Sequence, residues 1–167
     1  EVFFTNVRVK DSQRLGAEGD GWKVSLVTLM NERLAVGGAT GAGWSQFMET
    51  ARKTPGLDGA SALQDQALRE KLADWYVQAE GLKHTRNRTM TALSRGQTPG
   101  PESSIGKIIS AVQMQELANT AVEMLDQYGI ISDEDLAPLS AAFHWSLMFA
   151  PGLRIAGGTD EILRNII

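Results

Sequence analysis

The chain of 167 residues is 43% hydrophobic and 22% charged, proportions typical of one ordinary globular domain. Its formal net charge of −4 argues against a surface that binds nucleic acid. No apolar run approaches the roughly 18 to 20 residues that a membrane span needs. Because the sequence contains no cysteine, disulfides, thiolate catalysis and cysteine-ligated metals are excluded.

The first segment, residues 1–9, is rich in Val and Phe and predicts a strand. A single strand has no sheet to join here, so residues 1–19 are interpreted as the end of a preceding β domain with its linker. Residues 20–167 are interpreted as a separate helical domain. Since the first residue is Glu1 and not Met, we interpret the sequence as a piece of a longer protein.

Helical patterning dominates after residue 20. Helices are expected over about 22–52, 63–95, 102–128 and 138–149, with Pro151-Gly152 ending the fourth and a last helix starting near Thr159. Apolar side chains at 4-3-4-3 spacing on the second helix predict the seam of an antiparallel bundle. These are Leu68, Leu72, Trp75, Ala79 and Leu82. The third helix is expected to bury one broad face, made of Ile105, Ile109, Val112, Ala121, Leu125 and Tyr128. The predicted fold class is therefore all-α, an up-and-down four-helix bundle with a short N-terminal remnant of a β domain.

A basic cluster lies on the second helix: Lys83, His84, Arg86 and Arg88. Because these residues follow each other closely on a helix, their side chains point in several directions. We favour a solvated helix face over a phosphate site. The two histidines, His84 and His144, lie on separate predicted helices, so no metal site is expected.

The stretch from Asn31 to Gly43 is unusually rich in glycine for a helix, and each glycine costs up to about 1 kcal/mol there. Because glycine has no side chain, closely spaced glycines on a helix allow another backbone or a flat ligand to approach closely. Glu32 shares its helix face with Ala35, Val36 and Ala39, none of which can pair with its charge. Desolvation there would disfavour the charged carboxylate and make it a stronger base. From this pattern alone, an ordinary surface glutamate is the more common explanation.

A second unusual segment runs from Arg154 to Ile162. Two adjacent glycines free the backbone, Thr159 is a good N-cap, and Asp160 and Glu161 complement the positive end of a following helix. Amides at such a helix start can hold a carbonyl oxygen or the polar edge of a cofactor. A plain junction between a loop and a helix is the alternative.

Four segments of the sequence, taken in their order along the chain, resemble the acyl-CoA dehydrogenase family. The resemblance covers nearly the whole chain. Residues 1–22 resemble the end of that family's middle β domain, and residues 31–38 resemble the start of its first long helix. Residues 72–74 are similar to its second helix, and residues 156–165 look like its active-site loop and final helix. The last of these motifs is the most specific.

The resemblance implies an FAD enzyme that oxidises an acyl-CoA thioester to the trans-2-enoyl-CoA. In that family a glutamate removes the α proton, and most members carry it at the position of Gly157. The isovaleryl and long-chain types carry it on the first long helix before an arginine, which matches Glu32-Arg33. The resemblance therefore implies Glu32 as the catalytic base, Arg33 and Gly157 as substrate-binding residues, and Thr159 and Glu161 as flavin contacts.

Two departures from the family pattern concern the adenine end of FAD. The Arg-x-x-Phe-Gly motif is absent from Arg52–Gly59, and the Gln-x-x-Gly-Gly-x-Gly motif is altered over Glu123–Gly129. A non-catalytic partner subunit of a mixed assembly, or a related flavin oxidase or monooxygenase, is therefore an alternative. The resemblance also implies an electron-accepting flavoprotein as partner and a homo-oligomer (dimer or tetramer) or a hetero-oligomer. The compartment it implies is the cytoplasm of a bacterium or the mitochondrial matrix of a eukaryote.

Overall fold

The computed structural model describes residues 1–36, 41–56, 58–97 and 100–167. These described ranges form helices and turns, with no named strand among them. The α-helices are α1 (Gly21–Val36), α2 (Trp44–Lys53), α3 (Gln66–Ser94), α4 (Glu102–Leu125), α5 (Ala142–Ile155) and α6 (Asp160–Arg164). Short 3-10 turns occur at Asp11–Gln13, Ala62–Gln64, Asp126–Tyr128 and Pro138–Ala141. The all-α prediction is confirmed, and none of the described helices is long and apolar enough to cross a membrane.

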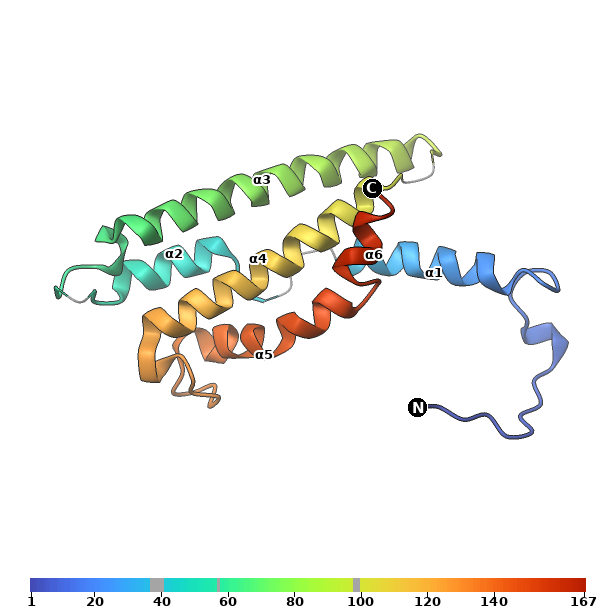
Figure 1. Cartoon of the computed structure of the whole chain (residues 1–167), viewed down its shortest axis with the longest axis horizontal. Helices are drawn as coiled ribbons and strands as arrows, with labels where there is room; N and C mark the ends of the chain where they lie inside the picture. Colours follow the sequence, from blue (N-terminus) through green and yellow to red (C-terminus); the bar gives the residue numbers. More distant parts are fainter. Residues whose placement is uncertain (37–40, 57, 98–99) are drawn as a thin grey trace.

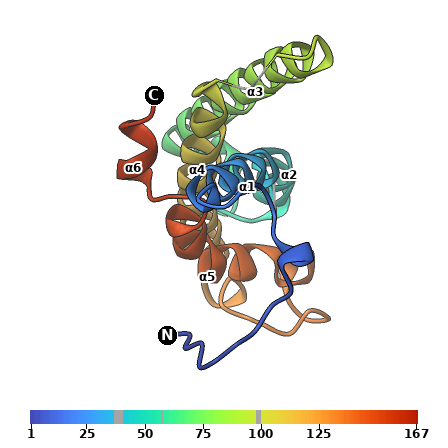
Figure 2. The same cartoon turned by 90° about the vertical axis from the view of Figure 1, so that its right-hand side faces the viewer.

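Helix α4 lies at the centre of the arrangement and contacts α1, α2, α3, α5 and α6 (Figure 1, Figure 2). The face predicted to be buried is only partly so: Ala121 and Leu125 are buried, whereas Ile105, Ile109 and Val112 are half-buried. Because α4 is surrounded on several sides, other side chains of the helix are buried as well. They include Ile108, Ala111, Met114, Leu117 and Ala118. The expectation that Tyr128 is buried was wrong: 57% of it is exposed. Tyr128 follows the end of α4 in a 3-10 turn, where the α-helical period that placed it on the buried face no longer applies.

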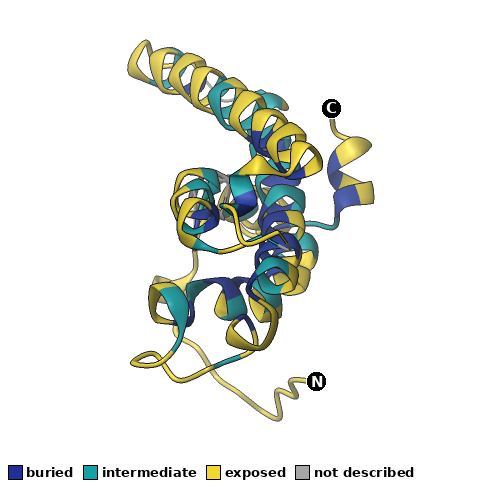
Figure 3. Cartoon of the chain, turned by 90° about the vertical axis from the view of Figure 1, so that its left-hand side faces the viewer, coloured by how far each residue is buried: buried dark blue, intermediate teal, exposed yellow. Residues whose placement is uncertain are grey.

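The main core lies where α2, α3, α4 and α5 meet. The Phe47 ring of α2 is fully buried and makes edge-to-face contacts with Trp75 of α3 and Phe143 of α5, at centroid distances of 5.2 and 6.1 Å. The predicted seam on α3 is confirmed at Leu68, Leu72 and Trp75, which are buried. Figure 3 shows that exposure increases toward the C-terminal end of α3.

One strand prediction and one helix prediction near the N-terminus were wrong. Residues 1–9 form no strand, because no other described segment supplies backbone partners for them. Their assignment with residues 10–19 to a preceding β domain stays a prediction. The helix predicted over residues 22–52 is two helices, α1 and α2. Gly41 has φ +90° and Gly43 is the N-cap of α2, so the chain changes direction at these glycines.

The expected break at Pro151 was also wrong, since α5 continues through it to Ile155. Proline has no N–H to donate, so the helix loses one internal hydrogen bond there. Packing offsets that loss. Ala150 and Leu153, on either side of Pro151, are buried in a second small core with Ala111 and Met114 of α4.

Candidate active site

The closing turn, residues 156–159, joins α5 to α6 and adopts a backbone conformation that favours glycine. Gly157 has φ +65° and Gly158 has φ +104°, both in the region that other residues rarely adopt. Thr159 follows as the N-cap of α6, and its Oγ1 accepts a hydrogen bond from the Ile162 amide at 3.3 Å. The predicted cap is therefore confirmed, and its position fixes where α6 begins.

A buried lysine holds this turn against α4. Lys107 is fully buried, and its Nζ donates to the Arg154 carbonyl at 2.9 Å, the Gly158 carbonyl at 2.8 Å and Asp160 Oδ1 at 3.3 Å. Arg154 Nε donates to the other carboxylate oxygen of Asp160 at 2.7 Å. Arg154 Nη1 also donates to Gln115 Oε1 of α4 at 3.0 Å. Two residues of α4 thus bond to the segment that contains the closing turn.

Asp160 and Glu161 are the two acidic residues in the first turn of α6, and their negative charges suit the positive end of that helix. Burial alone would raise the pKa of Asp160, but the hydrogen bonds from Arg154 and Lys107 outweigh it and hold the pKa below the usual range. The pKa of Glu161 is also lowered, first by its own backbone N–H and then by the Thr159 hydroxyl. Both carboxylates are therefore charged at neutral pH, where they complement the positive end of the helix.

Glu32 lies near the C-terminal end of α1 and is half-buried. Its carboxylate has no hydrogen-bond or ion-pair partner among the described residues. The side chain of Arg33 lies outside what the structure describes, as do residues 37–40 with Ala39. Helix α1, which carries Glu32, and helix α6, which follows the turn that carries Gly157, both contact α4.

Thr159 and the first turn of α6 place polar groups at the surface beside the glycine backbone. Thr159 is half-buried and Glu161 is exposed, so a hydroxyl and a carboxylate are available there to a polar ligand edge. The altered segment at the end of α4 fits a phosphate-bearing group less well. Glu123 and Asp126 are exposed there, and carboxylates repel phosphates.

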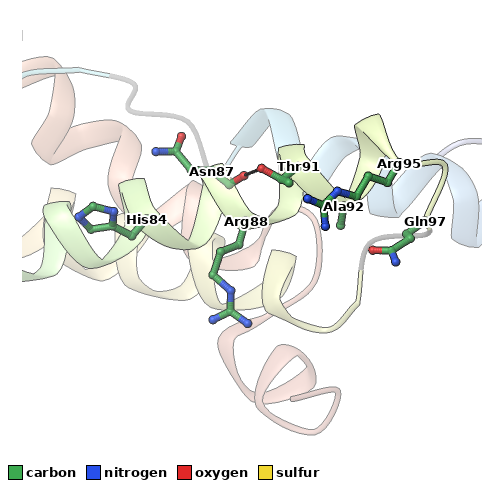
Figure 4. Close-up of a pocket in the computed structure, with 7 residues that line it drawn as sticks. All are labelled: His84, Asn87, Arg88, Thr91, Ala92, Arg95 and Gln97. Atoms are coloured by element: carbon green, nitrogen blue, oxygen red, sulfur yellow. Dashed lines mark hydrogen bonds between the residues drawn. The ribbon is translucent and has the colours of Figure 1, made fainter.

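Two residues of the basic cluster on α3, His84 and Arg88, line a surface pocket (Figure 4), together with Asn87, Thr91, Ala92, Arg95 and Gln97. The side chains of Asn87 and Arg88 point to different sides of the helix. The residues extend along roughly 20 Å of chain at a rise of about 1.5 Å per residue, so they do not converge on one small anion. This arrangement supports the interpretation of a solvated face.

Comparison with known proteins identifies the fold family. The family described as acyl-CoA dehydrogenase, C-terminal domain, matches residues 19–167. The chain belongs to the acyl-CoA dehydrogenase family. It is 31% identical over 166 residues to acyl-CoA dehydrogenase FadE34 of Mycobacterium tuberculosis, a match that covers 99% of this chain and 21% of that protein. An acyl-CoA dehydrogenase of Bacillus subtilis is 28% identical over 171 residues, covering 100% of this chain and 43% of the relative.

A solved structure with the same fold is the acyl-CoA dehydrogenase from Geobacillus kaustophilus. Its TM-score is 0.80 at 19% identity, over 99% of this chain and 42% of that one. The chain spans less than half the length of these relatives. The predicted resemblance and the helical domain it implied are thus confirmed.

The sequence analysis missed Lys107 and the ion pairs of Arg154 and Asp160. One signal was available, because Lys107 shares a helix face with Ser104, Ala111 and Met114, all buried. A lysine on an apolar face must find acceptors, since an unpaired buried charge is costly. The identity of those acceptors was not visible, because they lie 47 to 53 residues further along the chain.

Proposed function

We propose that the full-length protein catalyses the FAD-dependent α,β-dehydrogenation of an acyl-CoA thioester, with Glu32 as the base that removes the α proton. One observation carries the proposal. Glycine occupies position 157, where most of the family has its catalytic glutamate, and a half-buried glutamate lies on the neighbouring helix α1. A carboxylate near an acyl chain is partly desolvated, which favours its protonation by a carbon acid.

In the proposed reaction, the α C–H and β C–H bonds break and a C=C bond forms between the two carbons. The α proton moves to the Glu32 carboxylate, and bound FAD would accept the β hydrogen as hydride. Gly157 and Arg33 are proposed to contact the substrate, with the Gly157 amide donating to the thioester carbonyl and so acidifying the α proton. Thr159 and Glu161 are proposed to contact the flavin.

A catalytic subunit of this kind needs partners. We propose that the electrons leave to a separate flavoprotein. A chain in the solved structure of an electron transferring flavoprotein of Acidaminococcus fermentans has the fold of this chain, with a TM-score of 0.72. We also propose that the protein forms a homo-oligomer, because many large apolar side chains are exposed, among them Val77 and Met90 on α3.

A second candidate is a non-catalytic subunit of a mixed assembly. The exposed carboxylates Glu123 and Asp126 favour it, because they replace a motif that holds FAD in the family. The ChsE4-ChsE5 complex of Mycobacterium tuberculosis, which has this fold with a TM-score of 0.73, is a complex of two different chains. Flavin bound to the purified full-length protein would argue against this candidate.

A flavin oxidase on the same fold is the third candidate. The prolyl acyl carrier protein oxidase AnaB has this fold with a TM-score of 0.77 at 21% identity. Oxygen consumption in step with substrate turnover would separate an oxidase from a dehydrogenase.

The experiment that tests the proposal replaces Glu32 with Gln in the full-length protein. Glu32→Gln preserves the shape of the side chain but cannot accept the α proton. We expect the rate constant for flavin reduction by acyl-CoA to fall at least about 100-fold, while acyl-CoA still binds. Anaerobic stopped-flow absorbance of the flavin measures the rate constant.

The matched control is Glu116→Gln, which changes an exposed glutamate of α4 and should leave the rate constant unchanged. Equal rate constants in the two variants would show that Glu32 is not the base.

A further inference from the structure

Lys107 is the most deeply buried charged side chain among the described residues, and no step of the proposed function uses it. Its ammonium group has three donor hydrogens, and the structure provides three acceptors for them. All three acceptors belong to one short segment, residues 154–160. A charge that is buried and fully hydrogen-bonded in this way holds its partners in a single geometry.

The two backbone acceptors lie on either side of Gly157. The Arg154 carbonyl is in the last turn of α5, where carbonyls lack a donor within the helix. The Gly158 carbonyl directly follows Gly157 and belongs to a residue with φ +104°. By bonding to both, Lys107 fixes the segment before and after Gly157. Glycine has the widest choice of backbone conformations, so this segment requires such a restraint more than most.

The side chains add a second connection between the segment and α4. Asp160 accepts from Lys107 and from Arg154, and Arg154 also donates to Gln115. Lys107 and Gln115 are eight residues apart on α4, about 12 Å along the helix at a rise of about 1.5 Å per residue. The segment is therefore attached to a rigid helix at two separated points, which limits both its translation and its rotation.

We infer that Lys107 is the positioning residue of the active site, which holds the Gly157–Gly158 backbone in the conformation that receives the substrate carbonyl. This inference deepens the proposed function and rests on it for its catalytic part. Lys107 itself touches neither substrate nor flavin. Its effect on the reaction passes through the closing turn, where a displacement of about 1 Å can slow a reaction on the order of 100-fold.

The test uses Lys107→Met in the full-length protein, which removes the charge and the donors but keeps an unbranched side chain of similar length. The control is Lys71→Met. Lys71 of α3 also donates to α4, but to Thr120 at 3.2 Å, about 20 Å along α4 from Lys107 at a rise of about 1.5 Å per residue. Both variants remove a lysine that connects α4 to another segment, and only Lys107 connects it to the closing turn and its flanking residues.

The first measurement is hydrogen–deuterium exchange of peptides that cover residues 155–163, followed by mass spectrometry. We expect exchange at least about 10-fold faster in Lys107→Met than in the wild type, with the control unchanged, because the segment loses its attachment. This measurement does not depend on any activity, so it tests the inference even if the protein does not oxidise acyl-CoA. Unchanged exchange in Lys107→Met would overturn it.

The second measurement is the rate constant of flavin reduction in the anaerobic stopped-flow experiment. We expect a 10- to 100-fold decrease in Lys107→Met, and no more than about a 2-fold change in the control. If Lys107 only stabilised the fold, Lys107→Met would contain fewer folded molecules, and the amplitude of the flavin absorbance change would be smaller. The rate constant of the molecules that remain folded would be unchanged. That outcome, or faster exchange with a normal rate constant, would refute the positioning role.

Lys107→Gln provides the same test if Lys107→Met does not fold. It removes the charge and keeps only two of the three donor hydrogens that hold the segment. Faster exchange and a smaller rate constant are expected again, to a lesser degree. Wild-type values in both measurements would overturn the inference.

Discussion

Replacing Gly41 with Ala should destabilise the protein strongly, because two independent features of the structure require glycine there. Gly41 has φ +90°, a conformation that costs an L-residue about 1–2 kcal/mol. A Cβ at this position would also lie 2.6 Å from Ser146 Oγ and 3.0 Å from Met114 Cε. Relieving such an overlap costs typically about 1–3 kcal/mol. Together they predict that Gly41→Ala lowers the free energy of unfolding by about 2–5 kcal/mol.

The control is Gly81→Ala in α3, where an added Cβ would meet no atom within 4 Å. Glycine inside a helix is less stable than alanine by about 0.5–1 kcal/mol, so this substitution should stabilise the protein. Urea denaturation followed by the helical circular dichroism signal measures both changes. Two substitutions of identical chemistry are thus expected to have opposite signs. A Gly41→Ala variant as stable as the wild type would refute the reasoning.

The two contributions at Gly41 can be separated with Ser146→Ala. The Ser146 hydroxyl is buried and has no hydrogen-bond partner within the described part of the chain, so its removal should cost little. In the double variant, Gly41→Ala should be less destabilising because one overlap is gone. The cost of the positive φ would remain. If the double variant recovers nothing, the overlap with Ser146 contributes nothing to the effect.

Two further predictions concern stability. Phe47→Ala should lower the free energy of unfolding by about 3–5 kcal/mol, because the ring is fully buried against Trp75 and Phe143; a loss below about 1 kcal/mol in urea denaturation would contradict it. Asp160→Asn should be less stable than the wild type at neutral pH. The folded-state pKa of Asp160 is lowered, so its contribution is present above the unfolded pKa of about 3.9 and is lost as pH falls through the lower folded value. The difference between the two proteins, measured at a series of pH values, should therefore shrink below about pH 4, and a constant difference would show that the charge is not responsible.

The parts of the fold that the sequence predicted well have local signals. Thr159 caps α6, as predicted, by accepting a hydrogen bond from the Ile162 amide in the first turn of that helix. The apolar period on α3 correctly identified Leu68, Leu72 and Trp75 as buried, whereas Ala79 and Leu82 are only half-buried. These features depend on residues within one or two turns of each other, so short patterns were sufficient.

The wrong predictions share a different cause. The break at Gly41, the continuation of α5 through Pro151 and the exposure of Tyr128 all depend on how a segment packs against others. For example, Gly41 lies against Ser146, more than 100 residues away in the sequence. Helix propensity alone places a break at Pro151, but contacts with Ala111 and Met114 outweigh it.

The candidate site shows the same division between local and distant signals. Thr159, Asp160 and Glu161 could be recognised as a helix start from their order alone. Glu32 could be singled out only with the help of the family resemblance, and its role as base stays a prediction. Lys107 was not identified because its partners are distant in sequence, although its burial could be anticipated from the neighbours on its helix face.

The central position of α4 explains how a base could be supplied from a different segment than in most of the family. Catalysis requires a fixed distance between the base and the group that polarises the carbonyl, whichever segment carries the base. Here α1, which carries Glu32, and α6, which follows Gly157, both contact α4. Lys107 adds direct bonds from α4 to the closing turn. Under the proposal that Glu32 is the base, α4 is the common support of the base and of the closing turn, so a carboxylate on α1 in place of position 157 need not loosen the geometry. A glycine at position 157 then becomes possible, provided that another group restrains its backbone, and Lys107 supplies that restraint.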